Sequence, residues 1–218
     1  MTAPIRRPAV FGLGEQPRAP FVGVLRWEHE SPVATLLAQA FLDDPLVAAI
    51  CDAPTVERRR RMRWSFRIAV RSHCLAAQPG WIIAGSAATP AGVVLVTRPR
   101  AEVQSRSDWI FLLRGLTRIG TRTVLRGVRA AQTIATHAPP QPFTYLRTLG
   151  VDPQMQGQGL GSALVQQVIR TAVPTLPLYL ETAKEANLAF YARHGFDCIG
   201  EFRCLDVPVW RLIRRAEL

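Results

Sequence analysis

The stretch Gln156-Gly157-Gln158-Gly159-Leu160-Gly161 decides the fold, because of what stands on either side of it. Before it, the run from Tyr145 to Val151 alternates apolar and polar side chains, which predicts a half-buried strand that Asp152-Pro153 ends. After it, apolar side chains recur at spacings of three and four, as expected for an amphipathic helix with one packed face. These side chains are Leu160, Leu164, Val165, Val168 and Ile169. The predicted order is therefore strand, glycine-rich turn, helix.

Such a turn is a ready site for a phosphate group. Backbone N–H groups at the start of a helix lack carbonyl partners, and the helix dipole adds partial positive charge there. A side chain at Gly157, Gly159 or Gly161 would hold an anion away from these N–H groups, or forbid the dihedral angles that aim them inward. On these residues alone, the alternative is a tight connection that holds no ligand.

Two other nucleotide-binding motifs fit poorly. A Walker loop needs a lysine after its glycines, and the only lysine of this chain is Lys184. A dinucleotide-binding fold needs Gly-x-Gly-x-x-Gly near its first strand, with an acidic residue about 20 residues later. Here the spacing is Gly157-x-Gly159-x-Gly161, and the turn lies late in the chain.

The chain resembles the GNAT superfamily of acetyl-CoA-dependent N-acetyltransferases in three motifs that occur in the right order. The family's pyrophosphate-binding pattern, Gln/Arg-x-x-Gly-x-Gly/Ala, is present from Gln156 to Gly161. Leu178 to Thr182 is similar to the family's fifth strand, and Asn187 to Phe196 to its Asn-x-x-x-Tyr-x-x-x-Gly-Phe segment. Within the superfamily, Ala40 to Pro45 and the Leu-Glu-Thr run look most like puromycin N-acetyltransferase-like proteins.

The resemblance implies an α/β acyl-CoA N-acyltransferase fold, in which helices flank a mixed, mostly antiparallel sheet with a V-shaped opening between its central strands. It also implies acetyl-CoA as co-substrate and no metal. Backbone groups around Leu149 and Val151 would meet the acetyl and pantetheine groups, and the glycine-rich turn would hold the diphosphate. Asn187 would contact the pantetheine arm, or else only cap a helix. The expected cofactor-binding residues are Leu149, Val151, Gln156, Gly157, Gln158, Gly159, Leu160, Gly161, Ser162 and Asn187.

The reaction needs an acid for the departing thiolate and a base for the attacking amine. Tyr191 matches the family position that donates a proton to the CoA sulfur, and a phenol with a reference pKa of about 10 stays protonated at neutral pH. A core tyrosine without a catalytic role is the alternative. Residues 144–151 include no acidic side chain, so the carboxylate that many relatives place on this strand is absent. We therefore expect Glu181 to act as the base, directly or through a water.

Other titratable residues have less defined roles. Asp43 and Asp44 are expected to bind the ammonium group of the acceptor, or else only to mark the end of a helix. The imidazoles of His73, His137 and His194 are further alternatives for the base.

The rest of the chain supplies the remaining elements. The pattern predicts a strand over Phe21–Trp27, a helix from Ser31 as cap to about Asp43, and a second helix over Thr55–Ala77. Trp81–Ala87 and Gly92–Thr97 read as a hairpin whose turn is Thr89 to Gly92, and the residues after Asp197 as one or two closing strands.

Two stretches are rich in arginine. On the predicted helix 55–77, Arg59, Arg63, Arg67 and Arg71 repeat every four residues, as a solvated face does more often than a docking site. The segment Ser107–His137 continues this with Arg114, Arg118, Arg122, Arg126 and Arg129. Its glycines allow either one helix or two shorter ones. It could form a lid on the acceptor pocket, or a solvated helix packed on the sheet.

Composition narrows the class of protein. With 218 residues, 48% of them hydrophobic, the chain is expected to be one domain over residues 21–218 after a disordered leader, residues 1–20. No apolar run is long enough for a membrane span, and no signal peptide is indicated. The four cysteines, which we expect to be buried and reduced, form no Cys-x-x-Cys pair, so neither zinc nor disulfides are indicated. The net charge of +11 is the only feature that suggests a nucleic-acid partner, and we do not expect the protein to bind nucleic acid.

Together these features predict a cytoplasmic acetyltransferase. It would move an acetyl group from acetyl-CoA directly to a primary amine of a small molecule, antibiotic-like amines included. The alternative from another class is a non-catalytic acyl-CoA-binding or regulatory interaction protein, which keeps the cofactor site without a working base. The expected partner is a small-molecule amine, with no membrane and no nucleic acid, and a homodimer is left open.

Overall fold

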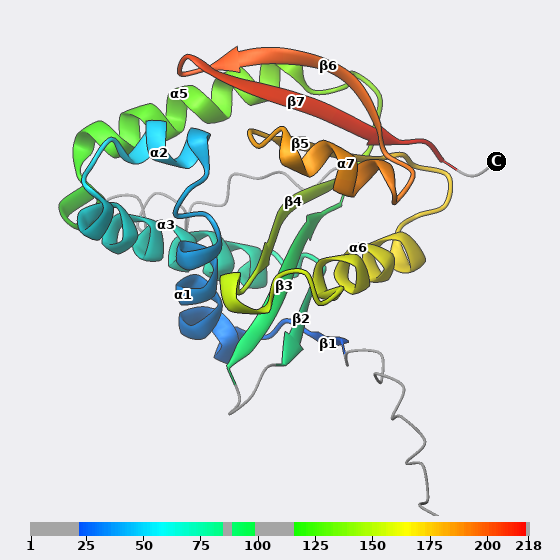
Figure 1. Ribbon diagram of the computed structural model, residues 1–218, viewed down its shortest axis with the longest axis horizontal. Helices are drawn as coiled ribbons and strands as arrows, with labels where there is room; N and C mark the ends of the chain where they lie inside the picture. Colours follow the sequence, from blue (N-terminus) through cyan, green and yellow to red (C-terminus); the bar gives the residue numbers. More distant parts are fainter. Residues whose placement is uncertain (1–21, 85–88, 99–115, 217–218) are drawn as a thin grey trace, which may run out of the picture.

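The computed structural model of the chain describes residues 22–84, 89–98 and 116–216, which form one seven-stranded sheet with helices on both faces (Figure 1). The strand order is β1-β2-β3-β4-β5-β7-β6, and all neighbours are antiparallel except β4 and β5. The strands are β1 (Val22–Val24), β2 (Gly80–Ala84), β3 (Pro90–Thr97), β4 (Thr144–Val151), β5 (Leu178–Thr182), β6 (Asp197–Cys204) and β7 (Val207–Arg214). The expected mixed, mostly antiparallel sheet is confirmed.

The helices divide between the two faces of the sheet. On one face lie α1 (Glu30–Ala40), α3 (Thr55–Leu75) and α5 (Thr121–His137), and on the other α6 (Leu160–Thr171) and α7 (Ala186–Ala192). The shorter elements are η1 (Trp27–His29), α2 (Pro45–Cys51) and η3 (Pro153–Met155).

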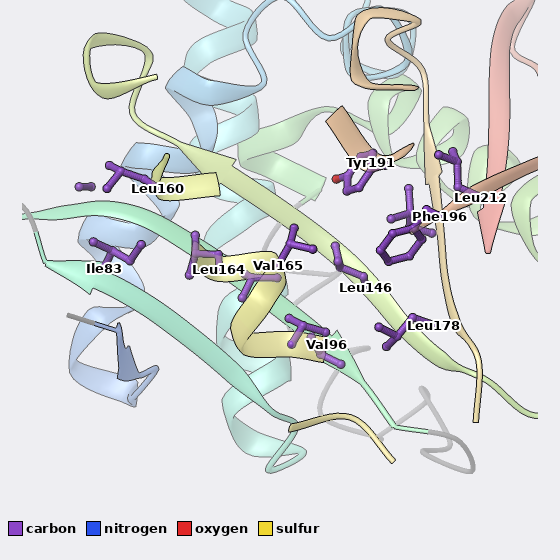
Figure 2. Packing of buried hydrophobic residues seen from close by; sticks show 14 residues of the cluster. Ile83, Val96, Leu146, Leu160, Leu164, Val165, Leu178, Tyr191, Phe196 and Leu212 are labelled. Atoms are coloured by element: carbon purple, nitrogen blue, oxygen red, sulfur yellow. The ribbon is translucent and has the colours of Figure 1, made fainter. Parts of the chain in front are cut away.

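Strand β3 is the centre of the core, because both of its faces are covered. Val93 and Leu95 pack with the buried residues of α1 and α3, whereas Val94 and Val96 pack with those of α6. Figure 2 shows the second of these clusters, in which Leu164 and Val165 of α6 lie in one cluster with residues of β2, β3, β4, β5 and β7. Full burial of one such side chain stabilises the fold by about 1.5–3 kcal/mol.

The sheet opens between β4 and β5. These parallel strands pair only at Thr144 with Leu178 and at Tyr145 with Tyr179. Beyond that point β4 stays paired with β3 and β5 with β7, so the two strands separate. The V-shaped opening expected from the family resemblance is therefore present.

The pairing register of β4 shifts at Arg147. Leu95 of β3 pairs with Thr148, but its neighbour Val96 pairs with Leu146. Such a bulge reverses which side chains face which side, so Leu146 and Leu149 both pack with the α6 cluster although they are three residues apart. Simple alternation along the strand, as the sequence suggests, would have placed them on opposite faces.

Several local predictions need correction. Helix α1 begins at Glu30 with His29 at its cap position, so Ser31 is not the cap. The first strand is shorter than expected because η1 already begins at Trp27. The sequence also missed α2, in which Pro45 starts a helix instead of only ending one; Asp44 caps it, its carboxylate accepting a hydrogen bond from the Val47 N–H at 3.0 Å.

The other elements lie close to their predicted positions. The second helix ends at Leu75, and Ala77 has a left-handed φ of 48°. Strand β3 already begins at Pro90, so the predicted hairpin turn at Thr89 to Gly92 is wrong, and residues 85–88 lie outside the described part. The predicted leader, residues 1–20, and most of the arginine-rich segment before residue 116 lie outside it as well.

The described part of the arginine-rich segment consists of two helical pieces. Residues 116–119 are helical, the chain turns at Gly120 with φ 88°, and α5 follows. The alternative of two shorter helices is therefore correct. Ala130 of α5 is buried against Phe202, Cys204 and Val209 of β6 and β7, so α5 is packed on the sheet.

Two further expectations concern the thiols and membrane spans. Cys51 and Cys204 are buried as expected, but Cys74 is half-buried and Cys198 is exposed; all four are free thiols. Among the described residues, no single helix has the length and apolar character to cross a membrane. The pair Trp27–Ala40 and Pro45–Cys51 meets both requirements only together, and it is bent by 107°.

Gly150 of β4 is required by close packing of α1 on the sheet. A Cβ atom at this position would lie 2.6 Å from Leu37 Cδ2 and 3.5 Å from Leu36 Cδ2. We expect Gly150→Ala to lower the free energy of unfolding by about 1–3 kcal/mol, the usual cost of overpacking a core. Urea denaturation of the purified variant measures this.

Gly127→Ala is the matched control, because a Cβ there would meet only Ile50 Cγ2 at 3.8 Å, an ordinary contact. It lies inside α5, where alanine is favoured over glycine by about 0.5–1 kcal/mol. Equal stability changes in the two variants would contradict the packing argument.

Candidate active site

A cleft with a volume of about 460 Å³ lies at the open end of the gap between β4 and β5. The end of β4, the glycine-rich turn, the first turn of α6 and one face of α7 all contribute to it, together with the connection between α1 and α2. Its lining consists of Ala40, Phe41, Asp44, Leu149, Gly150, Val151, Met155, Gln156, Gly157, Gly159, Leu160, Gly161, Ser162, Lys184, Asn187, Phe190, Tyr191 and Arg193.

The glycine-rich turn is held in place by its own polar groups. The Asp152 carboxylate accepts a hydrogen bond from the Gln154 N–H at 2.9 Å, and the Gln156 amide donates to the Val151 carbonyl at 3.3 Å. Gly157 and Gly159 have φ angles of 77° and 80°, which favour glycine. A Cβ at either position would meet nothing within 4 Å, so this surface is open to a ligand.

The start of α6 has the features of an anion site. Its cap position is Gly159, no side chain caps its N–H groups, and its first turn carries no acidic residue. The helix has 12 residues, so its dipole adds partial positive charge at this end. Gly161 lets the helix approach α7, because a Cβ there would lie 3.4 Å from Phe190 Cζ. These observations favour an anion-binding turn over a tight connection.

Two cationic side chains line the cleft, and sequence reasoning missed both. Lys184 follows β5, Arg193 follows α7, and both line the cleft. Asp44 is the only acidic residue among the lining residues. The usable signal was the position of Lys184, the single lysine of the chain, two residues after the strand that ends in Leu-Glu-Thr.

Asn187 reaches the cleft from the first turn of α7. Its side-chain amide donates to Thr182 Oγ1 at 2.9 Å, which ties α7 to the end of β5. The cap position of α7 is Glu185, so the alternative in which Asn187 only caps the helix is wrong.

Tyr191 lies on α7 at the inner wall of the cleft. The residue is 7% exposed, and its ring packs against Phe190 and Phe196, with centroid distances of 5.0 and 5.7 Å. Its hydroxyl lies on the side away from Phe196 (Figure 2). Burial raises the pKa of this phenol above its ordinary value, so it is protonated throughout the neutral range.

Glu181 lies on the other face of the sheet and does not line the cleft. Its neighbours Leu178 and Leu180 pack on the α6 side, so alternation turns Glu181 and Tyr179 to the opposite side. Burial raises the pKa of the Glu181 carboxyl, and a hydrogen bond from the Tyr145 hydroxyl, 2.6 Å from Oε2, opposes that rise. Burial also raises the pKa of Tyr145 well above its ordinary value, so Tyr145 is the donor of this bond.

Two further predicted site residues, besides Glu181, do not line the cleft. Gln158 is exposed at the tip of the turn, and Asp43 is exposed beside Asp44; neither belongs to the lining. Asp44 does belong to it, and burial raises the pKa of its carboxyl while the hydrogen bond from Val47 opposes that rise.

The imidazoles are engaged elsewhere. His73 is buried, and its Nε2 lies 2.8 Å from the Pro79 carbonyl. The ring of His137 stacks on Phe202 at a centroid distance of 4.2 Å. His194 bridges the start of α6, with Nε2 3.1 Å from Ser162 Oγ and Nδ1 3.2 Å from the Gln166 amide nitrogen. Burial raises the pKa of the Glu181 carboxyl and lowers the pKa of the His73 and His194 rings.

Comparison with known families decides the class of this protein. The sequence model of the Acetyltransferase (GNAT) family matches residues 44–196, well over half of the chain. The chain belongs to the GNAT acetyltransferase family. The matched region contains the glycine-rich turn, Glu181 and Tyr191, so the N-acetyltransferase class is supported over a non-catalytic binding protein. Within the described ranges, no group of three or more His, Cys, Asp or Glu side chains could hold a metal.

Solved structures share this GNAT fold at low sequence identity. A histone acetyltransferase HPA2-related acetyltransferase from Corynebacterium glutamicum is 21% identical with a TM-score of 0.72, over 92% of this chain and 98% of that one. An N-acetyltransferase from Staphylococcus aureus is 14% identical with a TM-score of 0.56, over 88% and 99%. A polyamine N-acetyltransferase from Drosophila melanogaster is 14% identical with a TM-score of 0.55, over 88% and 98%.

His73 makes the stability of the fold depend on pH. Burial lowers its pKa from 6.5 to about 4, because the ring loses hydration between α3 and the sheet. As the pH falls, His73 is protonated near pH 6.5 in the unfolded chain but only near pH 4 in the folded chain. We therefore expect the contribution of His73 to be complete above pH 6.5 and to fall by about 3 kcal/mol as the pH drops through this window.

Urea denaturation at several pH values measures this dependence, with His73→Gln as the variant that cannot titrate. Its amide can still donate to the Pro79 carbonyl, and its curve should be flatter than that of the wild type below pH 6.5. Parallel curves for the two proteins would show that His73 is not the group responsible.

Proposed function

We propose that the protein transfers an acetyl group from acetyl-CoA to a primary amine of a small molecule by direct transfer. The observation that carries this proposal is the uncapped start of α6, which opens onto a cleft that Lys184 and Arg193 also line. Backbone N–H groups at Gln156 to Ser162 would hold the diphosphate of the cofactor, because the helix dipole and the two cations all favour an anion there.

The rest of the cofactor would follow the cleft toward the gap in the sheet. Leu149 and Val151 line this path from β4 and Asn187 lines it from α7. Where β4 leaves β5, backbone groups of β4 have no strand partner on the β5 side and can meet the pantetheine and acetyl groups. A backbone N–H there can also stabilise the oxyanion of the tetrahedral intermediate.

The two proton-transfer residues approach the gap from opposite faces. The amine nitrogen attacks the thioester carbon and loses a proton to Glu181, directly or through a water. The tetrahedral intermediate then collapses, the bond from carbon to sulfur breaks, and Tyr191 gives its proton to the CoA sulfur. Burial suits both groups, because it keeps the phenol protonated and makes the carboxylate a stronger base than one in water.

We propose Asp44 as the carboxylate that binds the acceptor's ammonium group, because it lines the cleft whereas Asp43 does not. Ala40, Phe41 and Asp44 come from the stretch that resembles puromycin N-acetyltransferase-like proteins, and all three line the cleft. This placement supports an antibiotic-like amine as acceptor.

Binding of CoA tests the proposal directly. We expect Gly159→Asp to weaken the affinity for CoA by about 100-fold, because its carboxylate would stand where the diphosphate binds. The φ of Gly159 is 80° and aspartate tolerates this left-handed region, so the variant should fold. Isothermal titration calorimetry gives the dissociation constants.

Gly159→Asn is the matched control, since it has the same shape without the charge. It should lose about tenfold less affinity than the aspartate variant. The proposal would be contradicted if the well-folded wild type did not bind CoA. It would also be contradicted if the wild type, Gly159→Asp and Gly159→Asn bound CoA with the same affinity. Release of CoA thiol over a panel of amines then identifies acceptors.

The role of Glu181 predicts a particular pH profile. We expect kcat/KM to fall as the pH drops through the pKa of Glu181, at a higher pH than for an ordinary carboxyl group. Tyr145→Phe should move this limb to still higher pH, because it removes a hydrogen bond that favours the charged form. Stopped or continuous thiol-release assays across pH measure the limb.

Glu181→Gln should reduce kcat by about 100-fold or more and abolish the limb. Phe143→Leu serves as a control, because Phe143 packs against Tyr145 and Tyr179 but makes no hydrogen bond to Glu181. An unchanged acidic limb in both Glu181→Gln and Tyr145→Phe would assign the base to another group.

A further inference from the structure

A second cavity, with a volume of about 410 Å³, lies between α1 and α3 and shares no residue with the cleft. Its lining is strongly positive, because it contains five guanidinium groups and one indole. These residues are Arg59, Arg60, Arg63, Trp64, Arg67 and Arg118. The first five lie on α3 and the last on the helical residues 116–119.

The positive charge of this cavity is only partly balanced. Arg60 pairs with Glu57 at 2.8 Å and Arg67 with Glu30 at 3.0 Å. Each of these carboxylates is also shared with an arginine outside the cavity, Arg61 for Glu57 and Arg71 for Glu30. No carboxylate within the described ranges pairs with the remaining three arginines, which are Arg59, Arg63 and Arg118.

Like charges are closely spaced along this part of α3. Arg59, Arg63 and Arg67 succeed one another at intervals of four residues on a helix, where like charges repel. Arg67 and Arg118 also share one aromatic neighbour, with guanidinium carbons 5.4 and 5.5 Å from the Trp64 ring centroid. Arg59, Arg60, Arg63 and Arg118 are exposed and Arg67 is half-buried, so the guanidinium groups line a hollow that is open to solvent and accessible to a ligand.

We propose that this cavity binds a small phosphate-bearing anion. Planar guanidinium groups bind phosphate oxygens in pairs, and several together favour a ligand with more than one negative charge. The volume lies within the range of small-molecule sites, and the walls are concave, unlike the extended surface that a nucleic acid duplex needs. Because the two linings are separate, this site is distinct from the diphosphate turn at α6.

Pyrophosphate is a suitable probe, titrated by calorimetry into the full-length protein. Saturating CoA is present so that the turn at α6 is occupied. We expect saturable binding, and the double variant Arg59→Gln/Arg63→Gln should weaken it by about tenfold or more. Arg129→Gln/Arg170→Gln is the matched control, since it removes the same charge from exposed positions outside the cavity and should keep the affinity within about twofold.

Thermal unfolding supplies a second readout. Pyrophosphate should raise the Tm of the wild type and of the control but not of Arg59→Gln/Arg63→Gln. Without the anion, that variant should be at least as stable as the wild type, because it relieves repulsion on α3.

If both double variants lost the same affinity for pyrophosphate, the binding would depend only on the net charge of the protein, and the proposed site would be wrong. The absence of saturable binding would also overturn the site, as would tighter binding of duplex DNA at these same arginines, which would make this a nucleic-acid surface. The comparison of the two double variants does not depend on whether the chain binds acetyl-CoA, because the substituted arginines lie outside the cleft.

Discussion

The separation of β4 from β5 is the constraint on which the other features of this molecule depend. The two strands share only two residue pairs, while β3 holds the rest of β4 and β7 holds the rest of β5. Because β4 stops being a neighbour of β5 at that point, its end can turn into η3 and the glycine-rich loop without obstructing a strand. Helix α6 then begins at the mouth of the opening, and α7 completes the wall from the β5 side.

The acid and the base that we propose lie on opposite faces of the sheet. Tyr191 lies on the face of α6 and α7, and Glu181 lies on the face of α1, α3 and α5 with Tyr145 as its hydrogen-bond donor. Burial acts on both groups in the same direction, toward a higher pKa. In the proposed mechanism, a raised pKa keeps the Tyr191 phenol protonated, so that it can act as the acid. The same effect makes the Glu181 carboxylate a stronger base.

Local pattern was sufficient for β4, the turn and α6, because strand alternation, glycines and helical spacing are all encoded in neighbouring residues. It was insufficient wherever a distant partner decides the outcome. The register shift at Arg147 depends on β3, and the arrival of Lys184 and Arg193 at the cleft depends on how β5 and α7 return to it. Pro45 was read as a helix stop, although Asp44 before it is an equally local cap signal. The roles proposed for Tyr191 and Glu181 came from motif resemblance, since their spacing alone indicates no role for either side chain.

The shortness of the contact between β4 and β5 also bears on how firmly the molecule holds together. Apart from two residue pairs in the sheet, the N-terminal and C-terminal portions are held together by side chains packed around α6 and by the packing of α2 and α5 against β6 and β7. An elongated ligand lying along the cleft would contact β4 and α6 on one side of the cleft. On the other side it would contact α7 and Lys184. Its binding free energy would therefore stabilise the contact between the two portions of the molecule. Fluctuations that separate β4 and α6 from β5 and α7 should become rarer once the ligand is bound.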